Sequence, residues 1–170
     1  LLKHALKEAS KLWDDYSIPH ITNEKNKYTS GTTVLVTLVI GYTVHMLWVG
    51  DSRGIYTKDD NDKIYHTIDH KPNTNDIVGS GTFIKNNRVN GILGVGRAIG
   101  DNGLKLRGAI KRIPDYKCYE FDKKTTIILA SDGLYDIHDH NSILKIPLDS
   151  IRSEHYIDNM SMIRIDIEKK

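Results

Sequence analysis

The chain has 170 residues, of which 39% are hydrophobic and 27% are charged. These proportions are typical of a soluble globular protein with one domain, and they exclude disordered and fibrous classes. The formal net charge is +2, from 24 basic and 22 acidic side chains spread along the chain, which excludes a nucleic-acid-binding arm.

The first predicted element is an amphipathic helix over residues 2–16. Apolar side chains recur there at spacings of three and four, with charged side chains on the opposite face. The apolar positions are Leu2, Leu6, Ala9, Leu12, Trp13 and Tyr16. We expect this face to lie on a core, Pro19 to end the helix, and the polar stretch 22–29 to form an exposed loop.

Strands dominate the rest of the chain. β-Branched runs at 33–40 and 43–49 flank Gly41-Tyr42 and predict a tight hairpin. The apolar core of the first run is read as a buried strand, because it is far shorter than the ~20 residues that cross a bilayer. Further strands are predicted at 54–57, 63–68, 82–84, 88–89, 116–121, 125–130 and 163–168, with turns at 58–62, at Asn86-Asn87 and at 122–124.

Many antiparallel strands with one core-facing helix predict an α+β layered domain. A parallel sheet would need alternating strands and helices, which the sequence lacks. Cys118 is the one cysteine and is interpreted as a packed strand residue. It can form no internal disulfide, so we expect an intracellular, cytoplasmic location.

Four short runs place carboxylates beside glycines or at strand ends. Hard divalent cations prefer oxygen ligands, and converging aspartates repel one another unless a cation offsets their charge. The runs therefore predict a carboxylate-built site for Mg²⁺ or Mn²⁺. They are Gly50-Asp51-Ser52-Arg53, Gly96 to Asp101, Ala130 to Asp136, and Asp158-Asn159-Met160-Ser161.

These runs belong to six motifs that occur in a fixed order and resemble those of the metal-dependent protein serine/threonine phosphatases, type 2C. The resemblance covers roughly residues 29 to 165. The motifs are Thr29 to Thr33, Val49 to Arg53, Asp69 to Pro72, Arg88 to Gly91 with Gly96 to Asp101 and Lys105, Ala130 to Asp136, and Asp158 to Ser161.

The resemblance implies a two-layer antiparallel β-sandwich flanked by helices, in the order α-β-β-α, with a binuclear Mg²⁺ or Mn²⁺ centre at one end. In such enzymes a water that bridges the metals attacks the phosphorus of phosphoserine or phosphothreonine. The implied partner is a phosphoprotein substrate, with neither nucleic acid nor membrane involved. Residues 1–170 would be the C-terminal portion of one such domain, and residues 71–92 would be its flap-like segment.

The resemblance also implies roles for four aspartates. Asp132 matches the residue that ligates the second metal, and Asp158 matches the residue that shares this task, so both are the candidate catalytic ligands. Asp51 and Asp136 match residues of a third, weaker metal position. For Asp51, a role in capping a strand end is the alternative.

Three further residues belong to motifs read as structural. Gly133 would let the backbone turn sharply beside the ligand Asp132. Arg97 and Asp101 would join the sheet to the segment that covers the cleft.

One family motif has no counterpart in this chain. The family's first metal is held through an Asp-Gly-His motif, which is absent here, and its phosphate-binding arginine lies in the same N-terminal portion. We therefore expect an N-terminally incomplete domain with half of a metal centre. Two alternatives remain open: a catalytically inactive phosphatase-like binding module, and a regulatory cation-binding domain.

Other candidate chemistry is weaker. His138 and His140 could form a small metal cluster with Asp136 and Asp139, but no third histidine recurs at helical spacing as zinc sites usually require, so they are interpreted as solvated polar residues. Ser131 lacks the glycine context of a serine-hydrolase nucleophile.

Overall fold

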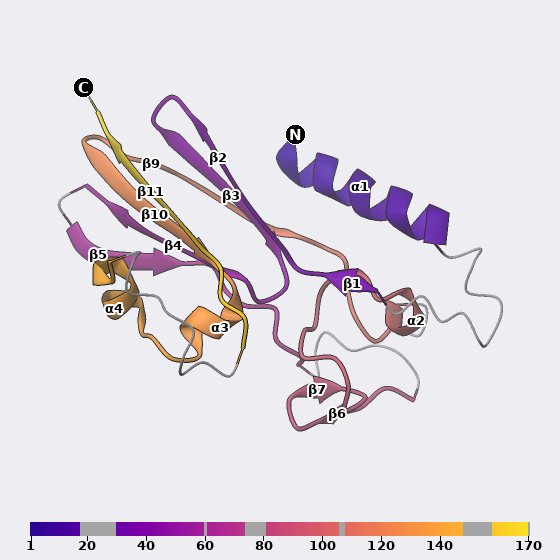
Figure 1. Cartoon of the computed structure of the whole chain (residues 1–170). Coiled ribbons are helices and arrows are strands. Elements are labelled where there is room, and N and C mark those ends of the chain that lie inside the picture. The colour runs from indigo at the N-terminus through magenta and orange to yellow at the C-terminus, as the bar shows by residue number, and fades with distance from the viewer. Residues whose placement is uncertain (18–29, 60, 74–80, 106–107, 148–157, 170) are drawn as a thin grey trace. The chain divides into compact units, whose positions relative to one another are not determined.

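The computed structural model describes residues 1–17, 30–59, 61–73, 81–105, 108–147 and 158–169 (Figure 1). Backbone contacts group the chain into two compact units. The first unit comprises residues 1–36, 47–51 and 69–117, and the second comprises residues 37–46, 52–68 and 118–170.

Strands outnumber helices in the described residues, as the fold class predicts. The helices are α1 (Leu2–Ser17), α2 (Asn102–Lys105), α3 (Asp132–Tyr135) and α4 (His140–Lys145). The strands are β1 (Gly31–Thr32), β2 (Val34–Ile40), β3 (Thr43–Val49), β4 (Arg53–Lys58), β5 (Asn61–His66), β6 (Ile84–Lys85), β7 (Arg88–Val89), β8 (Ile99–Gly100), β9 (Asp115–Glu120), β10 (Lys124–Ala130) and β11 (Met162–Glu168). The α+β class is confirmed.

A four-stranded antiparallel sheet is the frame of the second unit. Its strand order is β11-β10-β4-β5. The central strand β10 carries two adjacent isoleucines, Ile127 and Ile128, that are both fully buried. Because successive side chains of a strand point to opposite faces, both faces of this sheet are covered.

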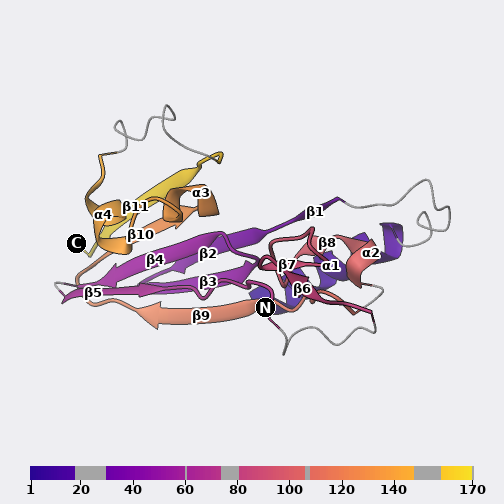
Figure 2. The same cartoon turned by 90° about the horizontal axis from the view of Figure 1, so that it is seen from below.

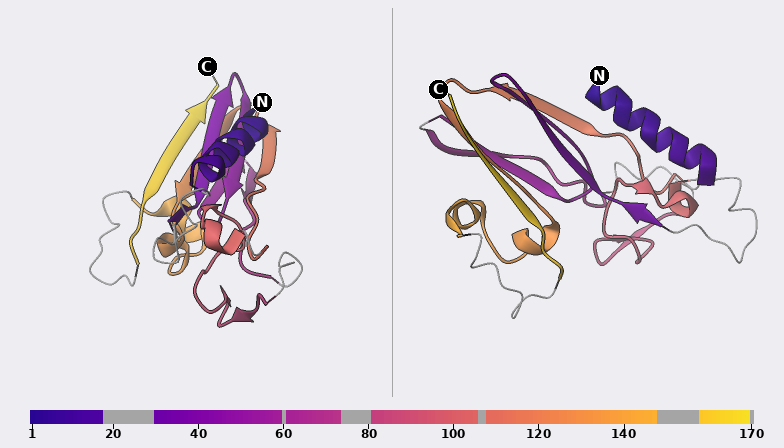
Figure 3. Two further views of the ribbon diagram at one scale, coloured as in Figure 1. Left: turned by 90° about the vertical axis from the view of Figure 1, so that its right-hand side faces the viewer. Right: turned by 45° about the horizontal axis from the view of Figure 1, so that its top comes forward.

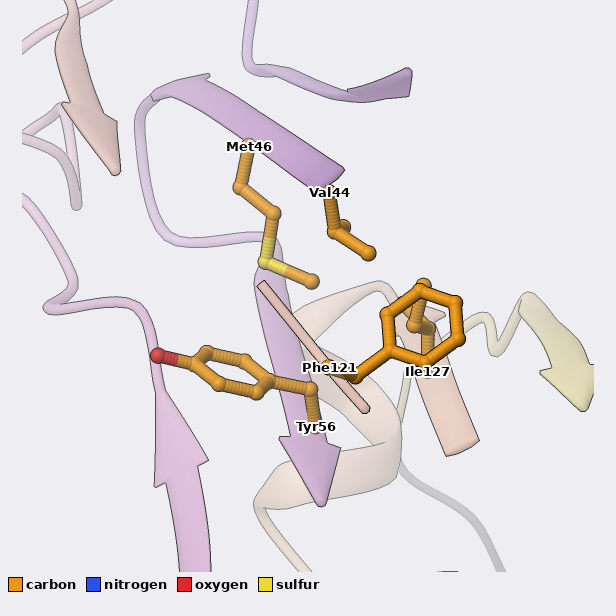
Figure 4. Close-up of a cluster of buried hydrophobic side chains, with 5 residues drawn as sticks. All are labelled: Val44, Met46, Tyr56, Phe121 and Ile127. Atoms are coloured by element: carbon orange, nitrogen blue, oxygen red, sulfur yellow. The ribbon is translucent and has the colours of Figure 1, made fainter. Parts of the chain in front are cut away.

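One face of this sheet packs against the three-stranded sheet, whose order is β2-β3-β9. The buried side chains at this contact are Val44, Met46, Tyr56, Phe121 and Ile127 (Figure 4). The ring of Tyr56 on β4 also stacks on Tyr119 of β9, with ring centroids 3.8 Å apart. The two sheets therefore form the β-sandwich that the resemblance implies.

The other face packs against the short helices α3 and α4. Ile55 and Ile128 of the sheet contact Leu134 of α3 and Ile143 of α4, and all four are buried. Figure 2 shows both helices beside β10 and β11. Asp139 caps α4, because its carboxylate accepts hydrogen bonds from the first backbone N–H groups of the helix. A helical layer thus covers one side of the sandwich in this unit.

Strand β2 forms an edge of its sheet and is only partly covered. The hairpin with β3 turns at Gly41-Tyr42, as predicted (Figure 3). On alternate positions, Val36, Leu38 and Ile40 are exposed. The prediction of a buried strand is wrong for this face, because an apolar run indicates a strand but not how many of its faces have neighbours.

Helix α1 forms as predicted, but its apolar stripe is not buried along its length. Leu2 and Leu6 are half-buried, and the helix contacts β8. Leu12 and Tyr16 are 68% and 62% exposed, so the prediction of a core-facing helix fails in its second half. The 3.6-residue period predicts the apolar face but not its cover. Pro19 and the predicted loop 22–29 lie outside the described residues.

The first unit has a small core of its own, formed by Val89, Val95, Ala98, Ala109 and Ile110. The predicted hairpin at Asn86-Asn87 is confirmed between β6 and β7. Both asparagines have positive φ, 53° and 57°, as a two-residue hairpin turn of the primed type requires. This hairpin lies in the predicted flap-like segment 71–92, of which residues 74–80 are outside the described chain.

Candidate metal centre

The segments that carry Asp132 and Asp158 meet at one end of the four-stranded sheet (Figure 1). Strand β10 ends at Ala130 and continues through Ser131 into α3, whose first residue is Asp132. Strand β11 begins at Met162, which pairs with Ala130. Because the two strands are antiparallel, the end of β10 lies beside the start of β11. The sheet register therefore brings the two segments together.

Ser131 ties these two segments by three hydrogen bonds. Its backbone N–H donates to the carbonyl of Ser161 at 3.0 Å, and its Oγ accepts the N–H of Ser161 at 2.9 Å. The same hydroxyl donates to the carbonyl of Asn159 at 3.3 Å. A side chain dismissed as a nucleophile thus holds the Asp158 segment beside α3.

Gly133 permits the close approach of the same segment. A Cβ at this position would lie 2.7 Å from the backbone oxygen of Asn159 and 3.3 Å from Cβ of Asp158. Gly133 lies within α3 and is not among the residues with positive φ. Glycine is therefore needed here for its missing side chain, whereas the sequence suggested a sharp turn.

The two carboxylates differ in burial. Asp132 is half-buried, and its Oδ1 accepts the N–H of Gly133 at 3.1 Å. Asp158 is exposed, and its Oδ1 accepts the N–H of Asn159 at 2.7 Å. Each carboxylate is thus oriented by its own backbone, and both offer the oxygen atoms that Mg²⁺ and Mn²⁺ prefer.

The other two predicted ligands belong to different units. Asp136 is exposed at the end of α3, and its N–H donates to the carbonyl of Asp132, one helical turn earlier, at 3.0 Å. Asp51 is buried in the first unit, directly after β3, and its Oδ2 accepts a hydrogen bond from Lys71 Nζ at 2.6 Å.

The chemistry of the donors fits a hard cation, but the described residues do not form a closed site. No cluster of three or more His, Cys, Asp or Glu side chains able to hold a metal ion occurs in the part of the chain that the structure describes. What the second unit provides is two carboxylates on adjoining segments, and the missing side chain of Gly133 allows these segments to lie close together. Asp132 and Asp158 supply the type of oxygen ligand that such a cation prefers.

Arg97 and Asp101 hold loops of the first unit. One guanidinium nitrogen of Arg97 donates to the carbonyl of Ile113 and to Asp115, both at 3.0 Å. Asp101 has φ 49°, its N–H donates to the carbonyl of Ser30, and its carboxyl lies where a side chain at Gly31 would be.

Two predictions about other reactive residues are wrong. His140 is half-buried: its Nε2 lies 2.9 Å from a guanidinium nitrogen of Arg53, and its ring lies 4.6 Å from that of His66. Its neighbours come from β4 and β5, which no local pattern reveals. Cys118 is exposed, because it occupies an outward position of β9.

Comparison with known proteins decides the family. The model of the family described as "Protein phosphatase 2C" matches residues 1–164. The chain belongs to the protein phosphatase 2C family. It is 34% identical over 136 residues to protein phosphatase 1L of Bos taurus, covering 75% of this chain and 38% of that protein. It is 33% identical over 149 residues to a probable protein phosphatase 2C of Arabidopsis thaliana, covering 83% of this chain and 42% of that protein.

Solved structures show the same fold. A sex-determining protein of C. elegans superposes with a TM-score of 0.67 at 21% identity, covering 84% of this chain and 36% of that one. Serine-threonine phosphatase 2C from Toxoplasma gondii superposes with a TM-score of 0.62 at 22% identity, covering 85% of this chain and 54% of that one.

The chain spans about two fifths of the length of the first curated relatives that it matches. The protein phosphatase 2C family is metal-dependent, so the carboxylates are candidate ligands.

The described residues include no helix that is both long and apolar enough to span a membrane.

Proposed function

We propose that this protein is a protein serine/threonine phosphatase that hydrolyses phosphoserine and phosphothreonine with Mg²⁺ or Mn²⁺. The observation that carries the proposal is the junction of the Asp132 and Asp158 segments through Ser131 and Gly133. Three hydrogen bonds of Ser131 hold the two acidic segments together. Their close approach also requires glycine at position 133. Like charges at such a junction repel unless a cation lies between them.

In this proposal each residue of the chain has a defined task. Asp132 and Asp158 hold the cation, while Ser131 and Gly133 fix the spacing of their backbones. When bound, the metal lowers the pKa of water and neutralises charge on the phosphoryl oxygens. Asp136 and Asp51 serve as ligands of a further, weaker cation.

The domain organisation belongs to the same proposal. Residues 1–170 act as part of one phosphatase domain, and the segment 71–92 borders the groove that receives the phosphoprotein. The family match to residues 1–164 supports this assignment.

The test is an assay of phosphate release from a phosphothreonine peptide by the full-length gene product in the presence of Mn²⁺. We expect Asp132→Asn and Asp158→Asn each to lower kcat/KM by ~10²-fold or more. Loss of a side chain that only hydrogen-bonds to a metal ligand already lowers metal affinity or activity by roughly 10–100-fold, and loss of a ligand should cost at least as much. The matched control is Asp122→Asn. This exposed carboxylate lies before the start of β10, at the opposite end of the strand from Asp132, and its loss should leave the rate unchanged.

Two results would contradict the proposal. One is an inactive gene product in saturating Mn²⁺, which would favour the inactive binding module. The other is activity that survives Asp132→Asn unchanged.

A further inference from the structure

Asp51 leaves the end of β3 through an unusual backbone conformation. Gly50 has φ 105°, a value that L side chains rarely adopt, and a Cβ there would collide with the side chain of Thr33. The Asp51 side chain that follows is only 10% exposed. The backbone that leads into this buried carboxylate therefore depends on what holds Gly50.

His70 holds Gly50 by two hydrogen bonds that run in opposite directions. The backbone N–H of His70 donates to the carbonyl of Gly50 at 2.9 Å. The backbone N–H of Gly50 donates to Nδ1 of the His70 ring at 3.0 Å. The His70 side chain is 5% exposed, and its ring lies nearly parallel to that of Trp48 at a centroid distance of 6.1 Å.

These contacts fix the protonation of the ring. A backbone N–H can only donate, so Nδ1 must carry a lone pair and the ring proton must be on Nε2. Nε2 then donates to Oδ2 of Asp115 at 3.1 Å. A doubly protonated ring would present a donor to the N–H of Gly50, and that hydrogen bond would be lost.

Asp115 is itself held in place as an ionised partner. Its other oxygen, Oδ1, accepts a hydrogen bond from Arg97 at 3.0 Å. Burial raises the pKa of the Asp115 carboxyl, but the hydrogen bond from His70 and the charge of Arg97 outweigh it and leave that pKa below its ordinary value. Arg97, assigned only to a structural motif from the sequence, thus supports the orientation of the His70 ring.

The residue after His70 contacts the carboxylate itself. Lys71 Nζ donates to Oδ2 of Asp51 at 2.6 Å. The path of residues 70–71 is fixed in turn by Gly96, whose N–H donates to the carbonyl of His70 at 2.6 Å. A Cβ at Gly96 would lie 2.9 Å from the carbonyl oxygen of Lys71, so only glycine allows this contact without a shift. One short segment therefore fixes both the backbone before Asp51 and its carboxylate.

We infer that His70 is a positioning residue for Asp51: its neutral ring, protonated at Nε2 and held by Asp115, fixes Gly50 and so orients the Asp51 carboxylate toward a divalent cation. The inference rests on the proposed function in treating Asp51 as a cation ligand. His70 touches the backbone and not the reacting atoms, so it acts through Asp51.

The first measurement needs no variant. Nitrogen NMR of the His70 ring in the gene product should show an unprotonated Nδ1 and a protonated Nε2 at neutral pH. A proton on Nδ1 would overturn the inference.

The second measurement is Mn²⁺ affinity by calorimetry in two matched variants. In His70→Asn, the side-chain amide oxygen takes the position of Nδ1 of the histidine ring. In His70→Gln, the longer side chain carries its amide to the position of Nε2 instead. If His70 acts through Gly50, His70→Gln should weaken Mn²⁺ binding at the Asp51-dependent site by about tenfold. His70→Asn should stay within about threefold of wild type, because it keeps an acceptor for the N–H of Gly50. His4→Asn, at an exposed position of α1, is the control and should change nothing.

A double-mutant cycle separates positioning from a general structural effect. In an Asp51→Asn background, His70→Gln should cause no further loss of Mn²⁺ affinity. An equal loss in both backgrounds, or a wild-type affinity that Asp51→Asn does not change, would overturn the inference. Because these readouts are binding and NMR, a gene product without phosphatase activity would refute the proposed function and leave this inference standing.

Discussion

At the scale of single residues, the candidate site depends on two small side chains rather than on the acidic ones alone. The carboxylates supply charge, but Ser131 and Gly133 decide where the Asp158 segment lies. The serine does so by hydrogen bonds and the glycine by its lack of a side chain. Small residues beside a predicted ligand therefore carry part of the site's geometry.

Gly133 gives the sharpest prediction at this scale. In Gly133→Ala the new Cβ would meet the backbone oxygen of Asn159, which cannot swing away as a flexible side chain can. We expect the free energy of unfolding to fall by about 1–3 kcal/mol, measured by chemical denaturation.

The control for this change is Gly103→Ala in α2. Nothing lies within 4 Å of a Cβ at Gly103. Alanine is the better helix former, so stability should stay level or rise by up to about 1 kcal/mol. Equal losses in the two variants would show that the close approach at Gly133 is not the cause.

At the scale of elements, one aspartate joins two strand connections of the second unit. Asp59 follows β4, and one of its carboxylate oxygens accepts the N–H groups of Asp122 and Lys123, which lie between β9 and β10, and of Lys124, the first residue of β10. Its own N–H donates to the carbonyl of Lys124. Asp59 has φ 53°. Strand β4 extends to Lys58 and β5 begins at Asn61, so both strands reach into the predicted turn 58–62.

The link at Asp59 predicts a pH-dependent stability. The hydrogen bond from Lys123, followed by those from Asp122 and Lys124, lowers the pKa of Asp59 below its ordinary value of 3.8. The ionised carboxylate therefore stabilises the fold above pH 3.8, and this contribution is lost as the pH falls through the lowered pKa. We expect Asp59→Ala to lower Tm at pH 7, with the difference from wild type shrinking below pH 3.8. A Tm difference that grows at acidic pH would contradict the assignment.

At the scale of the whole molecule, the sequence predicted those structural features that residues close together along the chain determine. The strands and the Asn86-Asn87 turn follow from side-chain alternation and turn chemistry, and the order of the motifs predicted the family. The exposure of one face of β2 and of the second half of α1 was not predicted, because burial depends on partners that are distant in the sequence. The contact between His70 and Asp115 joins residues 45 apart and leaves no periodic signal.

The candidate site shows the same division. The motifs predicted Asp132, Asp158, Asp136 and Asp51 as ligands, and the register of β10 with β11 explains why the first two segments meet. Ser131 was dismissed and His70 was given no role, because their tasks consist of hydrogen bonds to backbone far along the chain. Side chains that position a ligand are harder to predict than the ligand.

The most direct test of the proposed metal centre is a crystal structure of the gene product, crystallised with Mn²⁺, in which anomalous scattering locates the metal. We predict a manganese peak at coordination distance from the carboxylates of both Asp132 and Asp158. Carboxylates of these two residues that face different surfaces, with no manganese between them, would contradict it.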